Sequence, residues 1–306
     1  MKRVIVAGLL LLSHPVFSQG ITNKKSMENK IHEQVSALFA GADERNWQKV
    51  EAVLDEKVVL DYSSMTANAP TVLTPKQISI AWAAFLPGFD RTNHQLSGFA
   101  VNTAGNTATV HYTGKADHFL QNAIWTVEGS YDTKLVFKSN QWLIAEHKFN
   151  FEKQSGDTTL PVKATEKMQI MVLTEQNRKV VDNFFVALET QKFEMLKEVF
   201  AANGKQLNPY APKSFPPSFD GAEGIYKQYS GLTENFGQMK FPRQIFATED
   251  PNFFFVKFRG EIAIKKGGKY ENDYLGTFKL ENGKVVEYTE YFNQIIMANA
   301  FGVELK

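Results

Sequence analysis

The sequence predicts an α+β fold that occurs twice in one chain, and two observations support this prediction. In each half, apolar residues at helical spacing come first and alternating strand-like stretches come last, which is the order typical of α+β domains. The two halves also match each other without a gap from Val35 in the first and Val181 in the second. We therefore expect two consecutive cone-shaped α+β barrel modules, each with three helices packed in a curved antiparallel sheet.

The repeat pairs apolar positions with apolar positions over its whole first stretch. It aligns Leu38 with Phe184, Phe39 with Phe185, Asp43 with Glu189, Trp47 with Phe193, Val50 with Leu196, and Leu54 with Phe200. Further on, residues 106–118 lie over 252–264, with Gly114 on Gly260, and residues 146–150 lie over 289–293. Only the first copy carries histidines, so the copies differ in the side chains best suited to acid–base chemistry.

The N-terminus has the pattern of a signal peptide, which we assign to residues 1–18. Lys2 and Arg3 precede the apolar residues 4–12, and a small residue stands at the expected cleavage site. This apolar stretch is too short to span a bilayer about 30 Å thick as a helix, so we expect no stable membrane anchor. We predict that the mature protein is exported and is either periplasmic or secreted.

Charge and cysteine content exclude several classes of function. The formal net charge of +1 reflects a balance of acidic and basic residues, whereas nucleic-acid binding normally needs a clustered basic face. We therefore expect no nucleic-acid partner. The chain has no cysteine, which rules out disulfide bonds and thiolate chemistry.

The first module, residues 28–153, is expected to begin with helices. A helix runs from Glu28, and a second short helix follows around Val50. Pro75 after Thr74 is typical of the N-terminus of a third helix. Alternating stretches predict strands at residues 58–62, 93–102, 106–118, 124–138 and 141–151.

Residues 154–173 form the predicted linker, because they are polar, contain Pro161 and show no periodicity. The second module, residues 174–306, repeats the order of the first. We expect its helices at residues 181–188, 193–200, around 225–232 and 293–301. Its strands are expected near 241–248, 252–264, 270–281 and 284–292.

The polar residues of the first module resemble a known pattern. It has an Asp four residues before a Trp, a Tyr fifteen residues after that Trp, a Thr-x-His, and a second His that ends the following strand: Asp43, Trp47, Tyr62, His94 and His118. Together with the order of elements, this is similar to the nuclear transport factor 2-like superfamily, in its SnoaL-like polyketide cyclase and scytalone dehydratase-like branches.

The resemblance implies that Asp43, Tyr62, His94 and His118 form the polar lining of an apolar pocket. Asp43 would hold a histidine, which we take to be His118, in one tautomer. His94 would be the second acid–base group, and Tyr62 would donate to a substrate oxygen or to a bridging water. The position before the Asp, which is a second Tyr in scytalone dehydratase, is Ala42 here.

Around these four residues, we expect Trp82 and Trp125 as apolar walls. Thr133 falls near the position that brings a carboxamide in the family, and we include it among the ligand-binding residues. Two histidines and a carboxylate are also a common metal-binding set, but here no pair has the i, i+4 spacing of helical metal motifs. We predict no metal site and no cofactor.

The other histidines are predicted outside the site. His111 stands at odd register to His118 on one strand, so it should face the other side of the sheet. His32 and His147 are expected at the surface or behind the site.

The second module lacks this polar set. Ile264 replaces His118, Glu189 replaces Asp43, and the region of His94 becomes Lys-Phe-Pro. We expect either a filled core or a ring-lined cavity without acid–base chemistry. The sheet faces are expected to pair, either with each other as an intramolecular pseudo-dimer or between chains as a homodimer.

Two functions follow from these observations. The first is a cofactor-independent lyase or isomerase that acts by His/Asp acid–base chemistry on a small, apolar, oxygenated ring compound. The second is a non-catalytic exported binding protein for small apolar ligands. The Asp, Tyr and His set favours chemistry, whereas Ala42 and the signal peptide favour binding.

Overall fold

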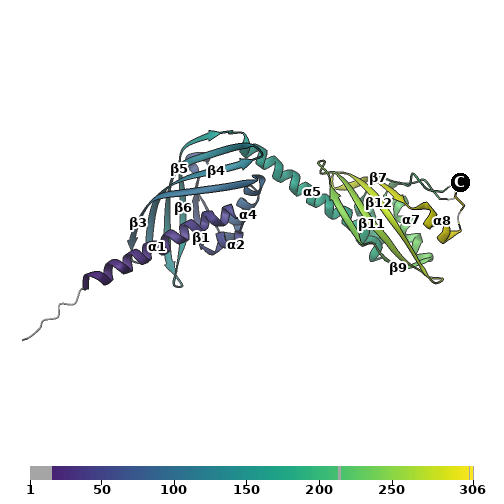
Figure 1. The fold of residues 1–306 in the computed structure, drawn as a ribbon, viewed down its shortest axis with the longest axis horizontal. Coiled ribbons are helices and arrows are strands. Elements are labelled where there is room, and N and C mark those ends of the chain that lie inside the picture. The colour runs from purple at the N-terminus through teal and green to yellow at the C-terminus, as the bar shows by residue number, and fades with distance from the viewer. Residues whose placement is uncertain (1–15, 213–214, 303, 306) are drawn as a thin grey trace, which may run out of the picture. The chain divides into compact units, whose positions relative to one another are not determined.

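The computed structural model of the chain describes residues 16–212, 215–302 and 304–305. It divides into two compact units, Met1–Met168 and Gln169–Lys306 (Figure 1). We treat these as the first and second modules, and each has its own hydrophobic core. Residues 1–15 of the predicted signal peptide lie outside the described residues, so the signal peptide remains a prediction.

The helices of the first module come early in the chain, as predicted. Their bounds are α1 Val16–Asp43, α2 Trp47–Ala52, α3 Ser63–Thr66 and α4 Pro75–Ala83, followed by the 3-10 turn Leu86–Gly88. The side chain of Thr74 accepts a hydrogen bond from the backbone N–H of Gln77, and the Gln77 side chain accepts one from the backbone N–H of Thr74. This capping box, with Pro75 behind it, fixes the start of α4 where the sequence predicted it.

The sheet of the first module curls around these helices (Figure 1). Its strands are β1 Leu54–Asp61, β2 Thr71–Leu73, β3 Arg91–Ala104, β4 Thr107–Leu120, β5 Ala123–Lys138 and β6 Gln141–Gly156, in the order β2-β1-β6-β5-β4-β3. The sheet is mixed and not purely antiparallel as predicted, because β1 pairs in parallel with β6. A parallel pair needs a long crossover, and the residues between β1 and β6 provide one.

The segment predicted as a linker is helical from Leu160. Helix α5, Leu160–Glu189, begins in the first module and ends in the second. Its N-terminal part packs on the first module: Ala164 is fully buried, and a Cβ added to Gly88 would lie 2.2 Å from the carbonyl oxygen of Ala164. Pro161 suggested a linker, but it lies in the first turn of α5, where proline is well tolerated.

The second module repeats the arrangement. Its other helices are α6 Leu196–Val199, α7 Gly221–Gly231 and α8 Gln294–Phe301, with 3-10 turns at Phe193–Met195 and Leu232–Glu234. Its strands are β7 Phe200–Leu207, β8 Ser218–Asp220, β9 Phe236–Lys240, β10 Arg243–Ala247, β11 Phe253–Ile264, β12 Lys269–Glu281 and β13 Lys284–Phe292. The sheet order is β10-β11-β12-β13-β7-β8, β9 also pairs with β11, and β7 runs parallel to β13.

The predicted strand at 241–248 is the second half of a broken strand. Both β9 and β10 pair with β11, and the break between them falls at Phe241 and Pro242. Proline has no N–H to donate, so it interrupts the ladder at this point.

The glycine shared by the two modules has a common structural role. A Cβ on Gly114 would lie 2.5 Å from the ring of Tyr131, and a Cβ on Gly260 would lie 3.1 Å from the ring of Tyr274. In both modules, the glycine on one strand leaves room for a tyrosine ring of the neighbouring strand to lie across it. The repeat in the sequence is therefore a repeat in packing.

Candidate functional site

A carboxylate at the end of α1 organises the polar centre of the first module. Asp43 Oδ2 accepts a hydrogen bond from the backbone N–H of His94 at 2.8 Å, and Asp43 Oδ1 lies 2.7 Å from His94 Nδ1. Thr92 Oγ1 donates to the same Oδ1 at 2.7 Å. The predicted partner of Asp43 was His118. That assignment is wrong, because β3 begins directly beside the end of α1 and brings His94 to the carboxylate.

The charge state of Asp43 determines the tautomer of His94. Burial raises the pKa of Asp43, but the hydrogen bonds and charge of His94, with a smaller contribution from Thr92, hold the pKa below its usual value. The ionised carboxylate can only accept hydrogen bonds, so the proton lies on His94 Nδ1. In the neutral form of His94, Nε2 therefore carries the lone pair that can accept a proton.

Two residues that the sequence analysis did not select hold Asp43 in place. Arg45 Nη1 donates to the carbonyl oxygen of Ala42 at 2.7 Å and to Thr92 Oγ1 at 2.8 Å, and its Nη2 donates to the carbonyl oxygen of Leu86 at 2.7 Å. Because the Thr92 hydroxyl accepts from Arg45, its own hydrogen points to Asp43. In the sequence, this role was indicated by Thr92, which is the threonine of the Thr-x-His pattern.

His118 lies beside His94, near the end of β4. The two rings are 6.1 Å apart between centroids in an edge arrangement, and the Trp125 and Phe89 rings lie 4.6 Å and 4.9 Å from His118. Burial, followed by the charge of His94, lowers the pKa of His118 to about 4, so this imidazole is neutral at neutral pH. Among the described residues, nothing hydrogen-bonds to its buried Nδ1.

His147 is a third interior histidine. Of its two predicted places, the surface is wrong, whereas a place behind the site agrees with its contacts to Thr133 and Tyr62. His147 is 1% exposed, its Nδ1 lies 3.1 Å from Thr133 Oγ1, and its ring stacks on Tyr131. Burial lowers the pKa of His147 to about 3, and its Nε2 has no partner among the described residues. The sequence did indicate this burial. On a strand, His147 points to the opposite face from its charged neighbours Glu146 and Lys148.

Three more of the predicted site residues contact either His118 or His147. Trp125 packs beside His118, whereas Tyr62 lies 6.2 Å from the ring of His147, and Thr133 bonds to His147. Phe39 contacts two of the histidines, at 5.1 Å from His94 and 5.6 Å from His147.

Two further predictions concern Trp82 and His111. Trp82 is partly buried and packs against the hydrophobic core of the first module. His111 lies on the outer face of the sheet, as predicted, where its Nδ1 is 2.8 Å from Asp132 Oδ1 and both side chains are 55% exposed.

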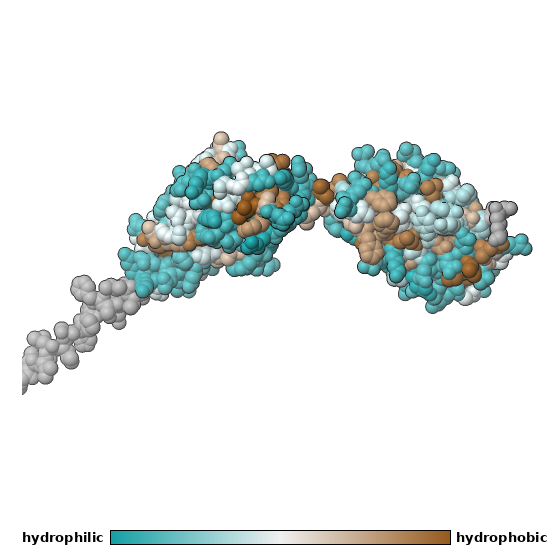
Figure 2. Space-filling model, turned by 45° about the horizontal axis from the view of Figure 1, so that its top comes forward, coloured by the Kyte–Doolittle hydropathy of each residue, from teal (hydrophilic) through white to brown (hydrophobic). Residues whose placement is uncertain are grey.

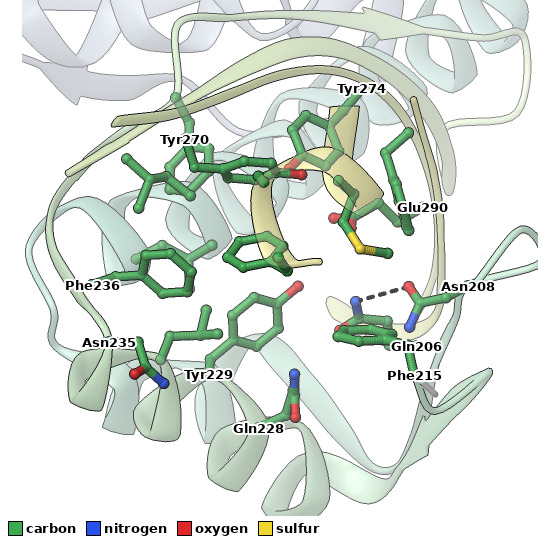
Figure 3. Close-up of a pocket in the computed structure, with 18 of the residues that line it drawn as sticks. Gln206, Asn208, Phe215, Gln228, Tyr229, Asn235, Phe236, Tyr270, Tyr274 and Glu290 are labelled. Atoms are coloured by element: carbon green, nitrogen blue, oxygen red, sulfur yellow. Dashed lines mark hydrogen bonds between the residues drawn. The ribbon is translucent and has the colours of Figure 1, made fainter. Parts of the chain in front are cut away.

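The second module contains a cavity of about 620 Å³ (Figure 3). The sequence analysis left open whether this interior was filled or ring-lined, and the structure shows a ring-lined cavity. Its walls include Phe241, Ile264 and Glu290. Burial raises the pKa of Glu290 to about 7, against a smaller opposing effect of its hydrogen bond from Tyr288. The sequence analysis did not select Glu290, although the repeat places it on His147.

The frame around this cavity copies that of the first module. Glu189 Oε1 accepts a hydrogen bond from the backbone N–H of Phe241 at 2.8 Å, as Asp43 does from His94. Arg243 Nη1 also donates to Glu189 at 3.0 Å. Phe241 therefore occupies the place of His94.

Two further properties concern the part of the chain that the structure describes. Within it, no group of three or more His, Cys, Asp or Glu side chains is arranged to hold a metal ion. No helix among residues 16–212 and 215–302 is both long and apolar enough to cross a membrane.

Two family models match the chain, one on each module. Both are described as SnoaL-like domains, and they match residues 26–148 and 181–288, which together make up more than half of the chain. The chain belongs to the SnoaL-like family, with two such domains in tandem and the nuclear transport factor 2-like α+β fold in each. The resemblance inferred from the sequence is confirmed at the level of the family.

Each of the curated relatives aligns with a stretch of the chain about as long as one domain. The phenazine biosynthesis protein PhzA1 of Pseudomonas aeruginosa is 28% identical over 141 residues, which is 44% of this chain and 86% of the relative. An uncharacterised PhzA/B-like protein of the same organism is 26% identical over 106 residues, which is 34% of this chain and 75% of the relative.

Among solved structures, a phenazine biosynthesis-related protein of Pseudomonas aeruginosa is similar in fold. It is 22% identical with a TM-score of 0.40, and the match covers 44% of this chain and 86% of that one.

Proposed function

We propose that the first module is a cofactor-independent lyase or isomerase that acts by acid–base chemistry on a small, apolar, oxygenated ring compound. The observation that carries this proposal is the Asp43–His94 pair, which leaves a ring nitrogen free as a base beside the neutral His118. The relationship to phenazine biosynthesis proteins supports a ring compound as the substrate class.

In this mechanism, His94 Nε2 takes a proton from a carbon next to a carbonyl group. The electrons of the C–H bond move to the carbonyl oxygen, and a hydrogen bond from neutral His118 stabilises the negative charge that forms there. Return of the proton to a different carbon isomerises the substrate. Transfer of the proton to a leaving hydroxyl group releases water instead.

Proton abstraction can be measured without knowing the product. In D₂O, the native protein should accelerate deuterium incorporation next to the carbonyl of aromatic ring ketones such as 1-tetralone, followed by NMR. His94→Ala should slow this exchange by about 10²–10⁴-fold. His111→Ala is the matched control, because His111 also pairs with an aspartate but lies on the exposed outer face. An equal loss in both variants, or no acceleration by the native protein, would contradict the proposal.

The alternative is a non-catalytic binding protein for small apolar ligands. Ala42 supports it, because a hydroxyl used in scytalone dehydratase-like sites is absent, and so does the cavity of the second module. In this case, the histidine variants should weaken ligand binding, and no exchange above the buffer rate should be found.

We further propose export through the signal peptide at residues 1–18 to the periplasm or the medium. The charged and apolar order of these residues supports it. N-terminal sequencing of the fractionated protein should find a start near Gln19. Recovery of chains that keep Met1 in the cytoplasm would refute export.

The sheet faces are proposed to pair, either within one chain as a pseudo-dimer or between chains as a homodimer. Phe246, Phe255 and Leu275 support this pairing, because they are 40–44% exposed on three neighbouring strands of the second module. Hydrophobic residues also interrupt the hydrophilic surface of both modules in Figure 2. For a homodimer, Phe255→Lys should shift sedimentation to the monomer, whereas a native chain that already sediments as a monomer would leave only the intramolecular form.

A further inference from the structure

The cavity of the second module has the size and lining of a small-molecule site. Its volume of about 620 Å³ lies within the range of about 300–1,000 Å³ that is typical of ligand pockets. Aromatic rings form much of its wall, among them Phe236, Phe241, Phe258 and Phe292. Figure 3 shows Phe236, Tyr229, Tyr270 and Phe215 around this cavity. Such walls suit a flat apolar molecule.

An unpartnered acceptor faces this cavity from β7. Gln206 lines the cavity and is 3% exposed, and its Nε2 donates to Asn208 Oδ1 at 3.3 Å. With the amide nitrogen turned to Asn208, the Oε1 of Gln206 has no hydrogen-bond partner among the described residues. A buried acceptor without a partner is costly, so a ligand that donates a hydrogen bond to it would be favoured.

Hydrogen-bond donors lie on β12 and β13, and β13 pairs directly with β7. Tyr270 accepts hydrogen bonds from Asn272 Nδ2 at 2.8 Å and from the Tyr274 hydroxyl at 3.1 Å. A hydroxyl that accepts twice keeps its own hydrogen, and no acceptor is found for it among the described residues. Glu290 extends into the cavity from β13, and one of its oxygens accepts from Tyr288 (Figure 3). In its protonated form, the other oxygen presents a second O–H donor.

We infer that the second module binds a neutral, flat, oxygenated aromatic molecule of two or three rings, whose carbonyl oxygen accepts from Glu290 or Tyr270 and whose hydroxyl donates to Gln206. The anionic form of such a ligand is excluded, because its negative charge would be buried among rings beside an acidic side chain. This site is separate from the chemistry proposed for the first module, and its occupancy does not depend on that chemistry.

The groups that face Glu290 make this binding sensitive to pH. The tyrosines around it are Tyr229 on α7, Tyr270 and Tyr274 on β12, and Tyr288 on β13, and the charge of Glu290 raises the pKa of each after the larger effect of burial. Lys266 is the cationic side chain of the lining. With a pKa of about 7, Glu290 loses its donor hydrogen between pH 6 and pH 8.5, when the tyrosines are still protonated.

Isothermal titration of the full chain with three two-ring probes tests the inference. The probe 5-hydroxy-1-tetralone carries the acceptor and the donor, 1-tetralone carries only the acceptor, and tetralin carries neither. At pH 6, affinity should fall in that order, and binding of the two ketones should weaken by about tenfold or more at pH 8.5. Glu290→Gln, which cannot ionise, should remove this pH dependence.

The variants locate the site. Gln206→Met keeps the volume and removes the acceptor, so it should weaken 5-hydroxy-1-tetralone by about fivefold to tenfold and leave 1-tetralone unchanged. Ile264→Trp should fill the cavity and abolish binding of the hydroxyketone. If this variant does not fold, Ala300→Trp on the exposed face of α8 serves the same purpose.

Three outcomes would overturn the inference. The first is that no probe binds the full chain at 1 mM, and the second is that tetralin binds as tightly as the hydroxyketone. The third is that both cavity-filling variants bind the hydroxyketone like the native chain. These binding measurements do not depend on turnover. All three outcomes can therefore be tested even if the proton-exchange experiment on the first module fails.

Discussion

The two modules share three interior positions: the residue whose backbone N–H bonds to the carboxylate at the end of α1 or α5, a residue near the end of β4 or β11, and a residue on β6 or β13. They hold His94, His118 and His147 in the first module and Phe241, Ile264 and Glu290 in the second. Around these positions, each module has a glycine beside a tyrosine ring and a carboxylate at the end of its first helix.

The difference lies in what the carboxylate reaches. Asp43 bonds to a backbone N–H and also to a ring nitrogen, whereas Glu189 bonds to the equivalent backbone N–H and to Arg243. The backbone bond is therefore common to both folds, and the imidazole bond is specific to the first module. One frame carries two different interiors, with three histidines in one and a carboxyl group of raised pKa among rings in the other.

The largest expected effect is a loss of stability of the first module in acid. His118 and His147 have pKa values of about 4 and 3 in the folded protein, whereas an unfolded chain binds protons at histidine near pH 6.5. Unfolding is therefore favoured as the pH falls from 6.5 towards 3, by up to about 5 kcal/mol for His147 alone. Urea unfolding followed by tryptophan fluorescence reports this module, because all four tryptophans lie in it.

A matched pair of variants sharpens that experiment. His147→Gln should reduce the dependence of the unfolding free energy on pH between 6.5 and 4, whereas His111→Gln at an exposed position should not. A native chain whose tryptophan transition is equally stable at pH 4 and pH 7 would show that these imidazoles are not buried in neutral form.

The next effect concerns rate. His118→Ile places in the first module the residue that the second module has at this position, and it removes the donor to the substrate oxygen. We expect proton exchange to slow by about 10²–10³-fold. The reverse change, Ile264→His, should leave the rate unchanged, because no carboxylate–imidazole pair stands beside it. Full activity in His118→Ile would remove this histidine from the mechanism.

The second module should respond to pH in the opposite direction. The pKa of Glu290 is raised from an ordinary 4.5 to about 7, so the folded state holds a proton that the unfolded chain releases. Stability is greatest below pH 4.5 and falls as the pH rises through 7, by at most about 3 kcal/mol, and by less where water in the cavity screens the charge.

Hydrogen exchange of the β13 amides at pH 5 and pH 8 measures this effect once intrinsic exchange rates are taken into account. Glu290→Gln should make protection independent of pH, and Glu287→Gln, an exposed residue on the same strand, is the control. Greater protection at pH 8 than at pH 5 in the native chain would reverse the sign that we derive.

The smallest effect tests the shared frame. Glu189→Gln weakens the bond to the Phe241 N–H and the ion pair with Arg243, so it should destabilise the second module by about 1–2 kcal/mol. Protection of the β11 amides should fall, while proton exchange on ring ketones stays at the native rate. A loss of that rate would mean that the modules are coupled in function.

Local patterns predicted most elements, and non-local pairing explains where prediction failed. The helix start at Thr74 and Pro75 and the strand alternation of residues 106–118 depend on neighbours in the chain, and both predictions are confirmed. The parallel pairing of β1 with β6 and the helix through residues 160–173 were missed. The first depends on residues 87 to 90 positions apart, and the second on packing of α5 against the first module.

The sequence by itself determined the repeat, the α+β class, the family and the set of polar residues in the first module, because periodicity and spacing are properties of the chain. Only the tertiary structure decided that Asp43 bonds to His94, that His147 is buried, and that the cavity lies where histidine is absent. Each of these depends on how side chains from separate strands and helices fill one interior. Their distances follow from packing and do not appear in the order of the residues.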